Sequence, residues 1–348
     1  MAILAKQITR IASRAPLAAS ALAMAVVACG PQSPSDPART AAALSGPIDR
    51  CVNLTDTLGL DEDLAWSDAV TRSDLMSISS AGFDTVRLPL PLMAFTGDTA
   101  PYQLKPAALE RLDQVVDWAS AANLGVVLTV SDVADHDTDP LVQTGQLNQV
   151  WTQLAIHFRD QSDALYFELV DAPTGDLTGS RLSDLNDVTL GSIRAADTRR
   201  WVIVPVADSS LEALTTATAT GDARTMRAVR YFEPVSVTQP APLDDASEQV
   251  DWGSMADFRS VMADMRTISE ARARLGEPVL ISGFGVHADV PAVMRARWTR
   301  AVRQTAEDNQ IGWCHWTYSG DHGLFDVETG RWVPELIDAL FRDGDTLN

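Results

Sequence analysis

Residues 85–130 read TVRLPLPLMAFTGDTAPYQLKPAALERLDQVVDWASAANLGVVLTV, and the order of patterns in this stretch indicates the fold. Two short apolar runs, 85–88 and 125–130, are typical of buried strands. The segment between them, 107–121, repeats apolar residues at the spacing of one helix face. These residues are Leu109, Leu112, Val115, Val116 and Ala119. A strand, a helix and a second strand in this order predict a parallel pair joined by a crossover helix.

The same alternation continues from about residue 48 to residue 341. Eight runs are strand candidates: 51–54, 85–88, 125–130, 165–170, 201–206, 228–231, 279–282 and 312–316. Helical periodicity also marks 147–158, 294–306 and a final segment, 333–341. Eight parallel strands alternating with helices predict a single-domain (β/α)8 TIM barrel, an α/β fold, over residues 48–348.

Composition narrows the classes of partner. Of the 348 residues, 46% are hydrophobic, which is enough for a sizeable core. The formal charge of −20 argues against nucleic acid and against anionic membrane surfaces. It also disfavours acidic polysaccharides, unless a local basic cleft opposes the field. A neutral oligo- or polysaccharide carries no such penalty, and its binding should be largely insensitive to salt.

The N-terminus has the pattern of a targeting segment. Lys6, Arg10 and Arg14 precede the apolar stretch 18–28, and the run 26–29 reads Val-Val-Ala-Cys, which resembles a bacterial lipobox. We therefore expect residues 1–28 to be a lipoprotein signal peptide and Cys29 to be lipidated; an ordinary secretory peptide is the alternative. Residues 29–47, rich in Pro, Ser, Ala and Thr, predict a flexible tether. The expected location is the periplasmic side of a bacterial envelope, with Gly30 after the cysteine favouring the outer membrane.

Four segments carry a family resemblance over about residues 48–341. They read AGFDTVRLPL (81–90), LYFELVDAP (165–173), PVLISGFGV (278–286) and IGWCHWTYSGDHGLFDVETGRW (311–332). In this order and at barrel spacing, they resemble glycoside hydrolase family 5, the cellulase-like barrel enzymes. The resemblance implies a site at the C-terminal ends of the strands, where TIM barrels carry their chemistry.

The resemblance places the family's acid/base at Ala172 and its nucleophile at Gly283. Retaining hydrolysis needs two carboxyl groups about 5 Å apart, and neither residue has a titratable side chain. The sequence thus predicts a catalytically impaired member. An active hydrolase, β-glucanase-like, that uses relocated carboxylates is the alternative, with Asp171 as the first candidate substitute. Other acidic residues near strand ends are Asp56, Asp132, Asp208, Glu233 and Asp321.

Residues outside the two catalytic positions match the family more closely. The resemblance implies ligand-binding roles for Arg87, Tyr231, Trp316 and Asn53, with Trp316 stacking on a sugar ring. For Arg87 and Tyr231, inherited packing without a present function is the alternative. Arg230 departs from the family, which has histidine there. Glu168 and Glu277 lie too far before the strand ends to be catalytic, and we interpret them as structural.

Two cysteines and several histidines complete the candidate sites. Cys51 opens the first strand and Cys314 lies in the eighth, so they form either a disulfide or two buried free thiols. The acidic run 135–139 lacks the glycine turn and distal glutamate of a calcium loop. His287, His315 and His322 lack a recognised zinc spacing. No metal and no cofactor are therefore expected.

The resulting hypothesis is an envelope lipoprotein that binds a glycan or serves as a scaffold in polysaccharide export or remodelling. The expected partners are a neutral oligo- or polysaccharide and the membrane, the latter through the lipid anchor only. An envelope protein is a further candidate partner. A protein-interaction module that ignores sugars is the remaining alternative.

Overall fold

The structure, a computed structural model, describes residues 46–54, 70–97, 99–131, 140–175, 177–239 and 252–342. Several predictions lie outside these residues: the signal peptide, Cys29, most of the tether, Asp56, Asp132 and the acidic run 135–139. Among the described residues, no helix has the length and hydropathy needed to cross a membrane.

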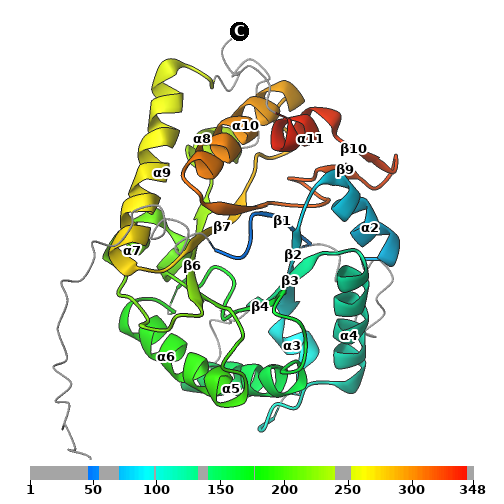
Figure 1. Ribbon diagram of the computed structural model, residues 1–348, viewed down its shortest axis with the longest axis vertical. Helices are drawn as coiled ribbons and strands as arrows, with labels where there is room; N and C mark the ends of the chain where they lie inside the picture. Colours follow the sequence, from blue (N-terminus) through cyan, green and yellow to red (C-terminus); the bar gives the residue numbers. More distant parts are fainter. Residues whose placement is uncertain are drawn as a thin grey trace, which may run out of the picture.

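Eight parallel strands close into one barrel in chain order, with β1 pairing β2 on one side and β8 on the other (Figure 1). The predicted (β/α)8 fold is confirmed. The strands are β1 (Arg50–Asn53), β2 (Thr85–Pro91), β3 (Gly125–Ser131), β4 (Leu165–Glu168), β5 (Val202–Pro205), β6 (Thr225–Tyr231), β7 (Val279–Phe284) and β8 (Gly312–His315).

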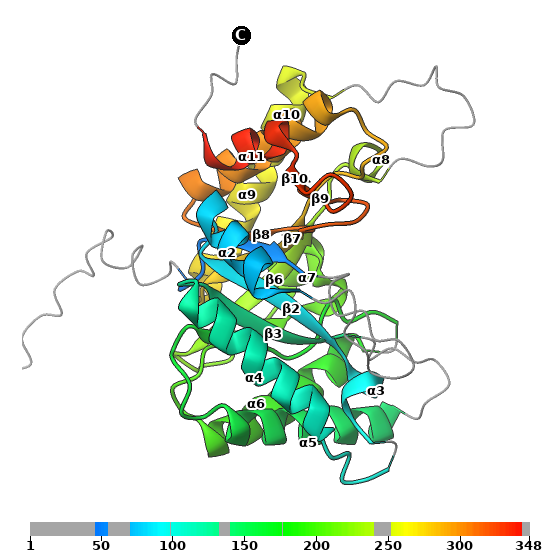
Figure 2. The same cartoon turned by 90° about the vertical axis from the view of Figure 1, so that its right-hand side faces the viewer.

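Helices surround the barrel, and short elements follow several strands at their C-terminal ends (Figure 2). The longer helices are α2 (Arg72–Ala81), α4 (Pro106–Ala121), α5 (Pro140–His157), α6 (Gly179–Ala196), α9 (Met255–Leu275), α10 (Ala292–Asp308) and α11 (Pro334–Phe341). The short elements are α3 (Leu92–Phe95), η2 (Ala207–Ser209), α7 (Leu211–Thr216), α8 (Val235–Thr238) and the hairpin of β9 (Phe325–Asp326) and β10 (Arg331–Trp332).

Local sequence explains where α2 and α9 begin and end. Each begins with a capping box, formed by Thr71 with Asp74 and by Ser254 with Asp257, which satisfies backbone donors of the first turn. The first ends at Gly82 and the second at Gly276, both in the left-handed conformation that glycine adopts without steric strain.

The core has two parts. A large cluster fills the layer between the strands and the helices, and a smaller one fills the barrel interior toward the N-terminal ends of the strands. Cys51 and Cys314 belong to the smaller cluster, face each other across β1 and β8, and form a disulfide. Of the two alternatives left open by the sequence, the structure thus contains the disulfide.

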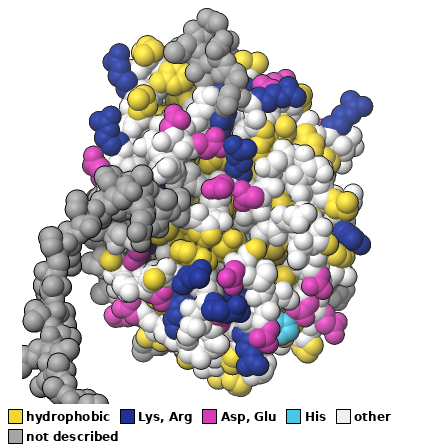
Figure 3. Space-filling view, in the orientation of Figure 1, with side chains coloured by type: hydrophobic (Ala, Val, Ile, Leu, Met, Phe, Trp, Pro, Cys, Tyr) yellow, Lys and Arg dark blue, Asp and Glu magenta, His cyan; other side chains and the backbone are white. Residues whose placement is uncertain are grey.

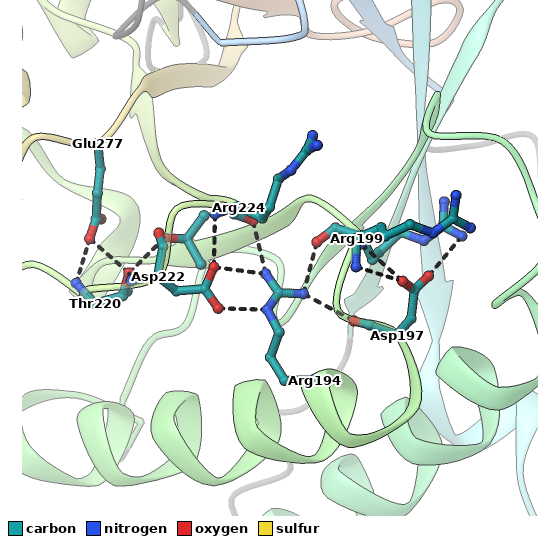
Figure 4. Close-up of polar contacts among 9 residues, drawn as sticks. Arg194, Asp197, Arg199, Thr220, Asp222, Arg224 and Glu277 are labelled. Carbon is teal, nitrogen blue, oxygen red and sulfur yellow. Dashed lines mark hydrogen bonds and ion pairs between the residues drawn. The ribbon is translucent and has the colours of Figure 1, made fainter. Parts of the chain in front are cut away.

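A polar network covers the N-terminal face of the barrel (Figure 4). Arg194 donates to Asp222 over 2.5 Å, and Glu277 accepts from Arg227 over 2.8 Å and from Thr220. Glu277 therefore lies at the end opposite the strand C-termini, in agreement with its structural interpretation. Basic and acidic side chains are interspersed on the face seen in Figure 3, so this face carries no single uniform field of negative charge.

Candidate functional site

Arg87, on β2, is the centre of a buried ion cluster at the C-terminal end of the barrel. Its Nε lies 2.6 Å from Oε2 of Glu168, its Nη2 2.8 Å from Oδ1 of Asp171, and its Nη1 2.8 Å from Oδ1 of Asn53. Arg87 and Asn53 are fully buried, and Glu168 is 1% exposed. All three nitrogens of the guanidinium are paired inside the protein, so Arg87 has no donor and no accessible surface for a ligand. Its role is to position the residues around it.

Asn53 connects this cluster to the neighbouring strands. Its Nδ2 donates to the carbonyl of Ser282 over 3.0 Å and to the carbonyl of His315 over 3.2 Å. The amide thus joins β1 to β7 and β8, and its remaining oxygen accepts from Arg87. Asn53, like Arg87, holds the geometry of the site beneath its surface.

Arg230, on β6, is the fifth member of what we call the Arg87 cluster (Arg87, Asn53, Glu168, Asp171 and Arg230). Its Nη2 donates to Oδ1 of Asp171 over 2.5 Å, so this carboxylate oxygen serves two guanidinium groups. The same guanidinium lies over the ring of Trp316, 4.5 Å from its centroid. The side chain of Arg230 is 25% exposed, whereas that of Arg87 is fully buried.

The two carboxyl groups of the cluster are shifted in opposite directions. Burial of Asp171 favours its neutral form, but Arg87 and Arg230 outweigh burial, so the pKa of Asp171 lies below its ordinary value. For Glu168 burial dominates, and its pKa lies above the ordinary value although Arg87 opposes the shift. Asp171 is therefore held as a carboxylate at neutral pH.

Ala172 and Gly283 flank this cluster. Ala172 follows Asp171 directly, and Gly283 lies within β7. A Cβ added at Gly283 would lie 3.3 Å from Cε3 of Trp316, 3.7 Å from Cγ of Arg230 and 3.8 Å from Cζ of Phe232. A side chain at 283 would therefore start tight against the ring of Trp316 and in ordinary van der Waals contact with Arg230 and Phe232.

Phe232 is a site residue that the sequence analysis missed. Arg230 and Phe232 both lie against the Cβ position of Gly283, at 3.7 and 3.8 Å. Side chains alternate along a strand, so Tyr231, which follows Arg230 in β6, points to the other side. Tyr231, expected beside the ligand, is 3% exposed; its hydroxyl donates to Asp264 of α9 over 2.8 Å, and its ring stacks on Trp298. Tyr231 therefore lies in the layer between the barrel and the helices, and not in the site as expected.

The remaining candidates lie around this centre. Trp316, half-buried, is the one of the four expected ligand-binding residues with accessible surface. Asp208, Glu233 and Asp321 are exposed on the rim. Burial lowers the pKa of His315 to about 3 and that of His322 to about 4, so both are neutral at pH 7. Among the described residues, no three His, Cys, Asp or Glu side chains are arranged to hold a metal ion.

The closed parallel barrel places the protein in the (β/α)8 class. Enzymes of this class carry their active sites at the C-terminal ends of the strands, where the Arg87 cluster lies. Within that class, the profile of the family described as Cellulase (glycosyl hydrolase family 5) matches residues 52–322, and the chain belongs to this family.

Individual relatives agree with this assignment. Endoglucanase H of Acetivibrio thermocellus is 24% identical over 301 residues, which cover 84% of this chain but 32% of that protein. The chain thus spans about a third of the length of this curated relative. A solved endoglucanase structure has a TM-score of 0.80 at 24% identity and covers 87% of this chain and all of its own. Cel5A of Thermotoga maritima, solved with mannotriose, has a TM-score of 0.77 at 25% identity, over 88% of this chain and all of its own.

Proposed function

We propose that this protein binds a glycan at the C-terminal end of its barrel and does not hydrolyse it. The observation that carries the proposal is the chemistry of two positions: Ala172 and Gly283, which resemblance assigns to the acid/base and the nucleophile, have no carboxyl group. Glycoside hydrolysis in this class depends on a pair of carboxyl groups flanking the scissile bond.

The carboxyl groups that remain nearby are poor substitutes. A general acid must hold a proton near the working pH, but two guanidinium groups keep Asp171 ionised. Glu168 is 1% exposed and lies against Arg87, so a sugar cannot reach it. These contacts favour the non-hydrolytic function over an active hydrolase with relocated carboxylates.

Binding needs neither an acid nor a base. Trp316 and Phe232 offer aromatic surface beside the polar groups of Arg230 and Asp171, and such a mixture suits the apolar face and hydroxyls of a sugar. Related structures are described in complex with cellobiose and with mannotriose. We extend glycan binding, without a particular sugar, to this chain.

The first prediction concerns hydrolysis. The mature chain should release no reducing sugar from β-glucan or β-mannan at enzymatic rates, because general acid/base catalysis alone contributes about 10²–10⁴-fold and the nucleophile is also missing. A reducing-sugar assay over a range of pH checks this. Turnover at rates ordinary for an enzyme would refute the proposal.

The second prediction concerns Trp316. Truncating a central aromatic residue commonly weakens binding by about 2 kcal/mol, which is roughly thirtyfold. Calorimetry should therefore show a loss of this size for Trp316→Ala with any oligosaccharide that the wild type binds. Trp201→Ala is the matched control, because Trp201 lies just before β5, at the opposite end of the barrel. Equal affinity of Trp316→Ala and wild type would place the binding surface elsewhere.

The third prediction concerns location. We propose that Cys29 carries the lipid that holds the protein at the bacterial envelope, where a glycan-binding barrel could act in polysaccharide export or remodelling. Labelling cells with a fatty-acid analogue should mark the wild type, and Cys29→Ser should abolish the label. Cys51→Ser, at a cysteine that pairs with Cys314, should keep it. Unlabelled wild-type protein in the soluble periplasm would contradict this assignment.

A further inference from the structure

All three guanidinium nitrogens of Arg87 are hydrogen-bonded, whereas Arg230 has guanidinium donors without a partner among the described residues. Among the described residues, Asp171 is its one hydrogen-bond partner, reached through Nη2, and its Nε has none. A quarter of the side chain is open to solvent, and the buried Nε faces away from it. The remaining edge of the guanidinium, at Nη1, is therefore available to a ligand that enters from the C-terminal end of the barrel.

The guanidinium is also held in a fixed plane. Trp316 lies beneath it at 4.5 Å, and Asp171 fixes one edge at 2.5 Å. A guanidinium group that is already oriented loses little conformational entropy when it binds a ligand. Its planar geometry matches that of a carboxylate, with which it can form two parallel hydrogen bonds. The stacking also covers one face of the Trp316 ring with Arg230, which leaves the accessible remainder of the indole for contact with a sugar.

The local charge is compatible with an anion. Arg87 and Arg230 share Oδ1 of Asp171, and the second carboxyl of the cluster belongs to Glu168. The two guanidinium groups therefore face two carboxyl groups, and the cluster brings no net negative charge to the site. On the rim, Asp289 and Asp321 lie near the ring nitrogens of His287, at 3.2 and 3.8 Å. Glu233 is exposed to solvent.

We infer that the glycan bound at this site carries a carboxylate, as uronic acids do, and that Arg230 holds this group while Trp316 and Phe232 contact the ring. This inference rests on the proposed glycan-binding function and names the class of its ligand. Oδ2 of Asp171, which has no partner among the described residues, is placed to accept from a neighbouring hydroxyl.

The inference revises one expectation drawn from composition. A charge of −20 favours neutral glycans over acidic ones, unless a basic group lies at the binding site itself. Arg230 is such a group. Long-range repulsion is screened at physiological salt within about 8 Å, so contacts made inside the site determine the preference.

The test compares two sets of sugars on four proteins. Oligomers of glucuronate, galacturonate and mannuronate, and neutral cello- and manno-oligosaccharides, are titrated by calorimetry against wild type, Arg230→Gln, Arg230→Lys and Arg224→Gln. Arg224 is the matched control, because it also lies over a tryptophan, 5.5 Å from the ring of Trp201, but is exposed on the N-terminal face (Figure 4). Thermal unfolding of each variant shows whether it is folded.

We expect wild type to bind an acidic oligomer and Arg230→Gln to bind it about tenfold to a hundredfold more weakly, the range of a charge-assisted hydrogen bond. Arg230→Lys should recover part of the loss, Arg224→Gln should equal wild type, and added salt should weaken binding. Wild type that binds only neutral sugars would overturn this inference and leave the proposed function intact. Acidic binding unchanged in Arg230→Gln would overturn it as well. Binding of neither set would count against both.

Discussion

Replacing Arg87 by methionine should lower the free energy of unfolding by about 3–5 kcal/mol, the usual effect of removing one partner from a buried ion pair. Arg87 is fully buried, and it is paired with Glu168, Asp171 and Asn53. Methionine fills part of the volume but offers no donor. Glu168 and the amide oxygen of Asn53 would lose their partner in the barrel interior, and Asp171 would keep only Arg230. Unpaired buried polar groups are strongly destabilising.

Urea unfolding at neutral pH measures this effect. The matched control is Arg159→Met, because Arg159 pairs with Asp160 on the surface with side chains 62% and 91% exposed, where ion pairs contribute little. A curve for Arg87→Met that coincides with wild type would show that the cluster does not support the fold.

The same cluster predicts a pH dependence. The folded state lowers the pKa of Asp171, so its contribution to stability is present above the pKa of the unfolded chain. That contribution is lost as pH falls through the still lower pKa of the folded state. The difference in stability between wild type and Asp171→Asn should therefore be largest near neutral pH and shrink in strong acid.

The second large effect concerns the disulfide. Cys51 and Cys314 are 263 residues apart in sequence, so the bond closes nearly the whole barrel into one loop. Restricting the unfolded chain in this way typically contributes about 2–5 kcal/mol. Cys51→Ala combined with Cys314→Ala should lower the stability by this amount, and a reductant should produce a comparable loss in the wild type.

A control separates loss of the bond from loss of packing. Both sulfurs are buried in the interior cluster, so alanine also removes contacts there. The reductant should therefore leave the double variant unchanged while it destabilises the wild type. Unfolding of the wild type that is identical with and without reductant would contradict the predicted contribution.

The barrel itself could be predicted because parallel strands buried on both faces read as continuous apolar runs. The ends of the strands were harder to predict. The apolar run predicts a second strand that ends at Leu88, yet β2 continues to Pro91. Within the part of the chain that the structure describes, this strand pairs beyond Arg87 with β3 alone, so the missing N–H of Pro89 removes no bond to β1.

The start of β6 was missed for a different reason. The strand begins at Thr225, three residues before the predicted start, and it includes Arg227. An arginine usually marks exposed backbone, but Arg227 is buried and pairs with Glu277 over 2.8 Å. The partner comes from 50 residues further along the chain, and no local pattern reveals it.

The candidate site was predictable in position but not in arrangement. Resemblance located Arg87, Asp171 and Trp316 at one end of the barrel, and the structure brings Arg87 and Asp171 together and places Trp316 against Arg230. The orientation of β6 was not predictable from resemblance, because pairing with β7 shifts register between Val229 and Arg230. Alternation alone could have shown that Arg230 and Phe232 share a side that Tyr231 does not.

The central claim is binding without cleavage, and one measurement tests both halves. The mature chain is saturated with an oligosaccharide that it binds by calorimetry, incubated at length, and the recovered sugar is analysed by mass spectrometry. We predict that the oligosaccharide is recovered intact, because Ala172 and Gly283 supply no acid and no nucleophile. Shorter fragments from wild type that are absent with Asp171→Asn would contradict the account and establish a hydrolase with a relocated carboxylate.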